Sequence, residues 1–255
     1  MKYLEHRCIA LLDVLGLSRR IRTKDGLTET LHIYCEAIEY FKSTFKATSA
    51  SSFEPNNKVP NFDAADFVFD TLVVVSRPLE EPDGAVLFFN AVSGLIAHFA
   101  RIGMPLRGAV GIGDYAREGE IFLGTIFKEL STAEKCQEWA GCILLASHAT
   151  EIIEIVGKVG PTPSQSAYFI RYDVPLKEGL LAGAWCVNWL DTFSESEIDG
   201  LLPCMEQDES KRKNTQAFFQ YYKNLPQIRM PLPSEFDPAK FVTITEADTR
   251  SRAYF

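Results

Sequence analysis

The chain has 255 residues, of which 46% are hydrophobic and 24% charged, and a formal net charge of −8. This composition is typical of a globular protein with a sizeable core. The acidic balance disfavours a nucleic-acid partner, because affinity for a phosphate backbone comes from clustered lysine and arginine. No apolar run reaches the length that spans a bilayer, so we expect no membrane partner. Six cysteines without a CxxC pair favour reduced core residues and a cytoplasmic protein.

The first three segments are a strand, a helix and a loop. Residues 7–15 form an apolar run interrupted by Asp13, which predicts a central strand buried on both faces. Residues 28–46 place apolar side chains at near-helical spacing and predict a helix with Thr28 as its N-cap. Residues 47–63 are rich in Ser, Asn and Pro and predict a long loop.

A second aspartate lies in the next element. Residues 65–76 contain two apolar pieces on either side of Phe69-Asp70, which predicts a hairpin with the Asp70 carboxylate at its bend. Further along, the pattern predicts a helix, a strand, a short strand that leads through Gly124 into a helix, and another strand, at residues 83–101, 106–113, 121–139 and 142–146.

The last third of the chain adds further elements. Strands are predicted at residues 168–174 and 184–189, and helices at 195–205 and 209–224. The order of all these elements predicts an α+β fold, with a ferredoxin-like βαββαβ core and a C-terminal α/β extension. We expect residues 1–160 to form the core and residues 161–255 to form an extension of the same domain.

Two aspartates, Asp13 and Asp70, each lie in an otherwise apolar run. A carboxylate on a core strand loses hydration worth several kcal/mol, and two carboxylates repel by roughly 4 kcal/mol at about 4 Å in an effective dielectric near 20. A divalent cation between them would offset both costs, and the predicted sheet brings them to the same end of adjacent central strands. The alternative is that each aspartate only caps or turns a strand.

Four motifs in order resemble a known family. They are Leu11-Leu12-Asp13-Val14-Leu15-Gly16-Leu17, Phe67-Val68-Phe69-Asp70-Thr71, Leu106-Arg107-Gly108-Ala109-Val110-Gly111-Ile112-Gly113, and the segment from Gly124 to Glu134. Together they resemble the catalytic domains of class III nucleotide cyclases over residues 7–146. Within that superfamily the chain is most similar to the pyrimidine cyclases of the Pycsar antiphage systems.

The resemblance implies a homodimer with its sites at the interface, a nucleoside triphosphate substrate, and attack of the ribose 3′-hydroxyl on the α-phosphate. It implies two Mn²⁺ or Mg²⁺ ions in each site. Their ligands would be Asp13, Asp70 and the backbone carbonyl of Val14. The backbone amides of Leu15, Gly16 and Leu17 would face the terminal phosphates, since a turn that opens into a helix presents free N–H groups to an anion.

Other positions depart from the adenylate and guanylate cyclase pattern. Where the family carries an Asn and, four residues later, an Arg that steadies the reacting phosphate, this chain has Lys128 and Thr132. Lys128 and Arg107 are therefore the predicted catalytic cations. The alternatives are that Lys128 lies on a solvated helix face and that Arg107 forms a structural ion pair.

The positions that read the base also depart from the purine cyclase pattern. Purine cyclases often place a Lys or Glu four residues before Asp70, and an Asp or Cys three residues before Gly124. This chain has Asp66 and Ile121 at these substrate-binding positions, and a pocket without the purine-type pair fits a pyrimidine.

The first functional hypothesis is a pyrimidine nucleotide cyclase that uses two metal ions, and the resemblance alone favours UTP over CTP. Its cyclic nucleotide would be a second messenger in antiviral defence, sensed by a separate effector protein. The second hypothesis is a catalytically degenerate cyclase-like domain that binds a nucleotide or a partner, because Thr132 occupies the position of the catalytic Arg. A polymerase-like palm shares the two-carboxylate arrangement, but the acidic charge disfavours it.

Overall fold

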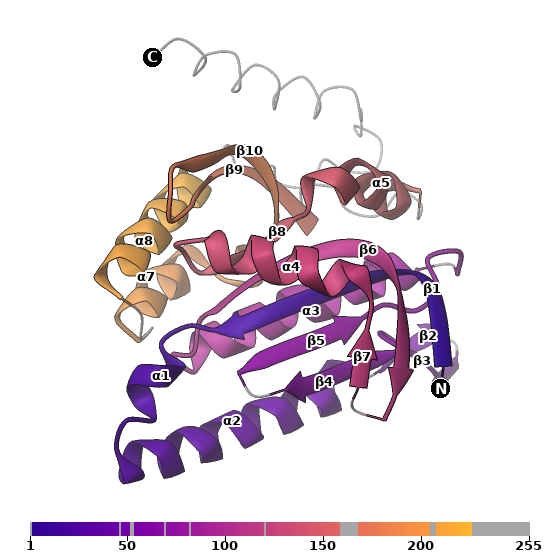
Figure 1. Ribbon diagram of the computed structural model, residues 1–255, viewed down its shortest axis with the longest axis horizontal. Helices are drawn as coiled ribbons and strands as arrows, with labels where there is room; N and C mark the ends of the chain where they lie inside the picture. The colour runs from indigo at the N-terminus through magenta and orange to yellow at the C-terminus, as the bar shows by residue number, and fades with distance from the viewer. Residues whose placement is uncertain are drawn as a thin grey trace.

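The computed structural model describes residues 2–45, 47–51, 54–68, 70–81, 83–119, 121–158, 168–204 and 208–225. It has the predicted α+β architecture, with helices packed on both faces of an eight-stranded sheet (Figure 1). The sheet order is β4-β5-β1-β6-β8-β10-β9, with β7 beside β6. These strands are β1 (Lys2–Val14), β4 (Ala64–Val68), β5 (Thr71–Val75), β6 (Leu106–Glu118), β7 (Ile121–Leu123), β8 (Gly141–Leu144), β9 (Phe169–Pro175) and β10 (Leu180–Val187).

The centre of the sheet has the ferredoxin-like order that the sequence predicts. Strand β1 lies between β5 and β6 and is antiparallel to both, and β4 is antiparallel to β5. Two helices make the crossovers, α2 (Lys24–Phe45) and α3 (Gly84–Arg101). Strand β1 is apolar on both faces because Ile9, Ala10 and Leu12 are fully buried, as the continuous apolar run predicts.

The long loop predicted at residues 47–63 is wrong. The backbone there forms a two-stranded hairpin of β2 (Ala47–Ser51) and β3 (Glu54–Pro60), separate from the main sheet. The segment lacks the apolar alternation that reveals a half-buried strand, so the composition of Ser, Asn and Pro dominates the sequence pattern.

The N-cap predicted at Thr28 is also wrong. Helix α2 begins at Lys24, and the Thr23 hydroxyl oxygen accepts a hydrogen bond of 3.1 Å from the Gly26 amide, as an N-cap does. Thr28 lies one turn inside the helix, where its hydroxyl donates to the Lys24 carbonyl. The first turn contains no large apolar residue before Leu27, so the apolar pattern misses it.

Helix α3 is the core helix of one face. It lies behind the sheet in Figure 1 and buries Phe88, Phe89 and Phe99 completely. It is also the one helix in the described ranges that has the length and composition to cross a membrane, which corrects the expectation that no apolar run is long enough. Of its most apolar window, 67% is buried inside the protein, as in a core helix.

Helix α4 (Thr125–Cys136) crosses the opposite face of the sheet (Figure 1). Ile126, Leu130 and Glu134 are its buried residues, at i, i+4 and i+8 along one side. Gly113 makes room for this helix, because a Cβ there would approach Ile126 to 2.7 Å. A carboxylate therefore occupies a position in the buried stripe of α4.

The C-terminal elements join the same sheet. Strand β10 pairs with β8, and β9 with β10. The remaining described helices are α1 (Leu17–Arg20), α5 (Ala146–Gly157), α7 (Glu195–Cys204) and α8 (Glu209–Asn224), with a 3-10 turn at Leu190–Thr192. The rings of Trp139, Tyr172 and Phe218 pack together, with centroids 4.6 to 5.2 Å apart.

Candidate active site

The two predicted metal-binding aspartates meet at one end of the central strands. Asp13 is the next-to-last residue of β1 and is paired in register with Thr71, the first residue of β5. Asp70 lies in the turn between β4 and β5, one residue beyond that pairing. Its carbonyl accepts a hydrogen bond of 3.2 Å from the Val14 amide. The sheet register thus brings the two aspartates together as the sequence predicts.

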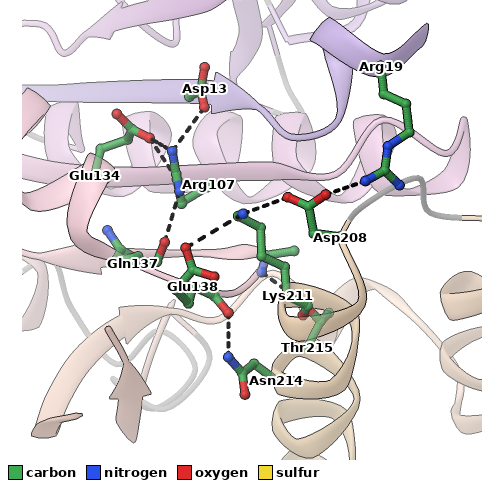
Figure 2. Close-up of polar contacts among 11 residues, drawn as sticks. Asp13, Arg19, Arg107, Glu134, Gln137, Glu138, Asp208, Lys211, Asn214 and Thr215 are labelled. Carbon is green, nitrogen blue, oxygen red and sulfur yellow. Dashed lines mark hydrogen bonds and ion pairs between the residues drawn. The ribbon is translucent and has the colours of Figure 1, made fainter. Parts of the chain in front are cut away.

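The Asp13 side chain belongs to a buried network around Arg107, which lies opposite it on β6. Figure 2 shows the Arg107 guanidinium between two carboxylates. Its Nη2 donates to Asp13 Oδ2 at 3.2 Å, its Nε to Glu134 Oε1 at 2.7 Å, and its Nη1 to the Gln137 carbonyl at 2.9 Å. One cation therefore serves two acidic side chains.

Negative charge is in excess at this end of β1. Burial and the charge of Glu134 raise the pKa of Asp13 to about 7, and Asp70 adds to the rise, while Arg107 opposes it. Burial and the charges of Asp70 and Asp13 raise the pKa of Tyr34 on α2 well above its usual value. Carboxylates that interact in this way favour a bound cation.

The residues present fit a hard divalent ion. Asp13 uses Oδ2 for Arg107, and Asp70 is an exposed carboxylate beside it. No group of three or more His, Cys, Asp or Glu among the described residues forms an all-protein metal site. Mg²⁺ is commonly held by one or two carboxylates together with water and substrate phosphates. Asp13 and Asp70 would provide the carboxylates, and the Val14 carbonyl would provide a further oxygen ligand.

The turn after β1 carries the three predicted phosphate-binding amides. Gly16 has the left-handed conformation (φ 80°), which favours glycine, and precedes the short helix α1 (Leu17–Arg20). The Leu15 amide donates to the Pro105 carbonyl at 2.9 Å. This corrects the expectation for Leu15, because its amide is already engaged, and leaves Gly16 and Leu17 as the candidate donors.

Arg107 has the surroundings of a structural residue. It is 7% exposed and its guanidinium is divided among Asp13, Glu134 and the Gln137 carbonyl. Moving it towards a phosphate would leave two carboxylates in the buried network without a partner, at a cost of several kcal/mol. The alternative reading of Arg107, a structural ion pair, is the one that these contacts support.

Lys128 and Thr132 lie on the exposed side of α4. The Thr132 hydroxyl donates to the Lys128 carbonyl at 2.8 Å. Both residues line a shallow open hollow of about 530 Å³ together with Thr125, Glu129, Ala133 and Cys136. No contact within the described ranges joins Lys128 to the Asp13 network, so this chain alone does not bring the two together.

The two predicted base-reading residues lie on β4 and β7, two strands other than the one that carries Asp13. Asp66 on β4 pairs with Arg117 on β6 at 2.9 Å, and its Oδ2 is buried without a hydrogen-bond partner among the described residues. Ile121 on β7 is 61% exposed. The Arg117 guanidinium lies 5.0 Å from the ring centroid of Phe122, the residue after Ile121, so Arg117 connects the neighbourhoods of the two positions.

Sequence reasoning did not predict that Glu134 pairs with Arg107 or that Tyr34 lies within reach of the charges of Asp13 and Asp70. The signal for Glu134 is its position in the buried stripe of α4, where a charged residue replaces an expected apolar one. Tyr34 has the same signal in weaker form, as a hydroxyl-bearing residue on the apolar side of α2. Its ring packs edge-on against Phe67 and Phe99.

Comparison with known proteins gives structural likeness only. No protein-family model and no curated protein matches the chain. The catalytic core of a rhodopsin-guanylyl cyclase with converted specificity, in complex with ATPαS, is 14% identical, with a TM-score of 0.47 over 73% of this chain and 97% of that one. The adenylyl cyclase CyaB from P. aeruginosa is 13% identical, with a TM-score of 0.46 over 73% and 96%.

A bacterial light-regulated adenylyl cyclase is 11% identical, with a TM-score of 0.45 over 88% of this chain and 58% of that one. Likeness at this level identifies neither an activity nor a substrate for this chain.

Proposed function

We propose that the protein is a nucleotide cyclase that converts a nucleoside triphosphate, UTP in preference to CTP, into the 3′,5′-cyclic nucleotide and diphosphate. The observation that carries the proposal is the meeting of Asp13 and Asp70 at the end of adjacent central strands. The left-handed turn at Gly16 follows directly. This combination supplies acidic ligands and the backbone amides of Gly16 and Leu17 side by side.

The chemistry is an intramolecular displacement at phosphorus. The ribose 3′-oxygen forms a bond to the α-phosphorus, the bond from that phosphorus to the α,β-bridging oxygen breaks, and diphosphate leaves. The 3′-hydroxyl proton passes to solvent. Asp13, Asp70 and the Val14 carbonyl would hold two Mn²⁺ or Mg²⁺ ions, and bound ions of this kind supply Lewis acidity that neutralises charge on the leaving group. Gly16 and Leu17 would orient the terminal phosphates.

A homodimer is part of the proposal because the described chain leaves Lys128 away from Asp13. Helix α4, whose exposed side carries Lys128, directly follows β7, where the apolar side chains of Ile121 and Leu123 are exposed. A second copy that covers this surface would bury apolar area and could bring Lys128 to the substrate of its partner.

Asp66 and Arg117 are the candidate base-reading pair. Among the described residues the buried Asp66 Oδ2 has no hydrogen-bond partner and is an acceptor, and the Arg117 guanidinium beside it is a donor. An adjacent acceptor and donor complement a base edge such as the uracil N3–H and O4. The choice of UTP and the role of the product as an antiviral signal for a separate effector protein rest on the resemblance to the Pycsar pyrimidine cyclases.

The test is incubation of the purified protein with each of UTP, CTP, ATP and GTP in Mn²⁺ or Mg²⁺, followed by mass spectrometry of the products. We expect cyclic UMP and diphosphate, and their loss in Asp13→Asn and in Asp70→Asn. Asp25→Asn, at an exposed position in the first turn of α2, is the matched control and should retain activity. Absence of a cyclic product from every nucleotide would contradict the proposal.

A second candidate is a nucleotide-binding domain without turnover. Thr132 at the expected Arg position and the engaged guanidinium of Arg107 favour it. Saturable binding of UTP with Mn²⁺, measured by calorimetry, together with no product in the assay above, would identify this function.

A further inference from the structure

The proposed substrate would bring more negative charge to a region already rich in it. A nucleoside triphosphate carries about four negative charges at neutral pH, and Asp13, Asp70 and Glu134 are all close to where it would bind. Arg107 is already engaged by Asp13, Glu134 and the Gln137 carbonyl. A cation from the chain itself, placed near the Gly16 turn and able to move, would offset part of this charge.

Arg19 has this position. It lies on α1, where its amide donates to the Gly16 carbonyl at 3.0 Å, so its backbone is fixed one turn after the candidate phosphate donors. Its side chain is 54% exposed and forms an ion pair with Asp208, the residue that precedes α8. The next residue, Arg20, donates instead to the Gly103 carbonyl.

The pair of Arg19 and Asp208 can exchange partners at little cost. Both side chains are more than half exposed, and exposed ion pairs typically contribute little to stability because water and salt screen them. A phosphate of higher charge that binds in the same place competes well with a single carboxylate. Arg107 lacks this freedom because it is buried together with Glu134 and Gln137.

Asp208 keeps a second cation if Arg19 leaves. The Lys211 ammonium lies 3.0 Å from Asp208 Oδ2 and 3.6 Å from Glu138 Oε1 (Figure 2). Helix α8 is also fixed independently, since Asn214 donates to the Glu138 carbonyl and the buried Thr215 hydroxyl accepts from the Ala140 amide. The helix therefore does not depend on Arg19 for its place.

We propose that Arg19 is a substrate-binding residue that pairs with the terminal phosphates of the nucleotide, and that Asp208 holds it when no substrate is bound. This inference rests on the proposed function for its substrate class, a nucleoside triphosphate. Asp208 is a competitor for Arg19 in this arrangement, so the two residues act in opposite directions on affinity.

The test uses this difference in sign. We expect Arg19→Gln to raise the KM for UTP about tenfold or more, because it removes charge-assisted hydrogen bonds to phosphate. Asp208→Asn should lower KM about two- to fivefold, because it removes the competitor. Arg19→Lys should restore part of the affinity. Lys223→Gln, which breaks another ion pair of α8 with Asp199, is the control and should leave KM unchanged.

Two results would overturn the proposal in an active enzyme. One is an unchanged KM in Arg19→Gln. The other is a change of KM in the same direction in Arg19→Gln and Asp208→Asn, which is the outcome for a pair that only holds α1 against α8.

Binding of inorganic tripolyphosphate with Mn²⁺ separates this inference from the proposed function. Calorimetry on the full chain should show binding that weakens in Arg19→Gln and strengthens in Asp208→Asn, whether or not any nucleotide is cyclised. If no cyclic product forms but these binding shifts occur, the proposed function fails and the role of Arg19 stands. If the wild-type protein does not bind tripolyphosphate, the role of Arg19 is overturned.

Discussion

The two ends of strand β1 carry charged clusters that differ in how deeply they are buried. At the C-terminal end, Asp13 and Arg107 lie in a buried network. At the N-terminal end, the half-exposed His6 ring lies between two exposed carboxylates, with Nδ1 2.6 Å from Glu80 and Nε2 2.9 Å from Glu151. Both clusters pair carboxylates with a basic side chain. The loss of a partner costs more free energy in the buried cluster than in the exposed one.

Both ends also contain a residue with left-handed backbone. Gly16 has φ 80° and His6 has φ 49°. His6 lies where the register of β1 with β6 shifts between Leu4 and Arg7, and its amide donates to Asp114 at 2.8 Å. Contacts from three segments hold a non-glycine residue in this conformation, whereas at the candidate site a glycine adopts it without strain.

Removal of Arg107 should have the largest effect. Arg107→Ala leaves the buried carboxylate of Glu134 and the partly buried carboxylate of Asp13 without their shared cation, so we expect the free energy of unfolding to fall by about 3 to 5 kcal/mol. Urea denaturation monitored by circular dichroism measures this. Arg19→Ala, which breaks an exposed pair, is the control, with an expected change below about 1 kcal/mol. A similar small loss in both variants would contradict the contrast between buried and exposed clusters.

Substitution of Gly16 should have a smaller effect. Gly16→Ala forces an L-residue into the left-handed region, which costs about 1 to 2 kcal/mol. Thermal and urea denaturation would detect it. Gly200→Ala is a matched control, because a Cβ at Gly200 meets no neighbouring atom, and it should not destabilise. Equal stability of Gly16→Ala and wild type would show that the turn adopts another conformation.

The His6 cluster should give a dependence of stability on pH. Hydrogen bonds to Glu151 and Glu80 raise the pKa of His6 above 6.5. Since the folded state binds the proton more tightly, the contribution is fully present below pH 6.5 and is lost as pH rises through the folded pKa. We expect the stability difference between wild type and His6→Gln to shrink between about pH 6 and pH 9. A difference that grows over this range would refute the assignment.

Replacement of Asp70 should have the smallest effect on stability. Asp70→Asn changes an exposed turn residue, so we expect the free energy of unfolding to stay within about 0.5 kcal/mol of wild type. The same variant should lose cyclase activity in the assay proposed above. A loss of several kcal/mol would mean that Asp70 has a structural role comparable to that of Arg107.

The fold follows from the sequence where burial and periodicity agree. The apolar runs around Asp13 and on β6, and the hairpin that carries Asp70, are confirmed. The start of α2 and the hairpin of β2 and β3 could not be predicted from apolar periodicity. Their residues show no apolar period, and backbone hydrogen bonds decide their structure.

One part of the candidate site could be predicted from the sequence and another part could not. The meeting of Asp13 and Asp70 could be predicted because each lies at the end of a recognisable strand. The partners of Arg107 could not, since Asp13 and Glu134 lie 94 and 27 residues away. The pair of Arg19 and Asp208 spans 189 residues. Contacts at these separations follow from tertiary packing and have no local pattern in the sequence.

The ring cluster around Trp139 has a consequence for the synthesis of the chain. Trp139 is completely buried, and its indole packs against Phe218, which the ribosome adds 79 residues later (218 − 139 = 79). At about 5 to 20 residues per second, the indole waits roughly 4 to 16 seconds for this partner. During this interval the Trp139 indole lacks the ring that packs edge-on against it in the folded protein.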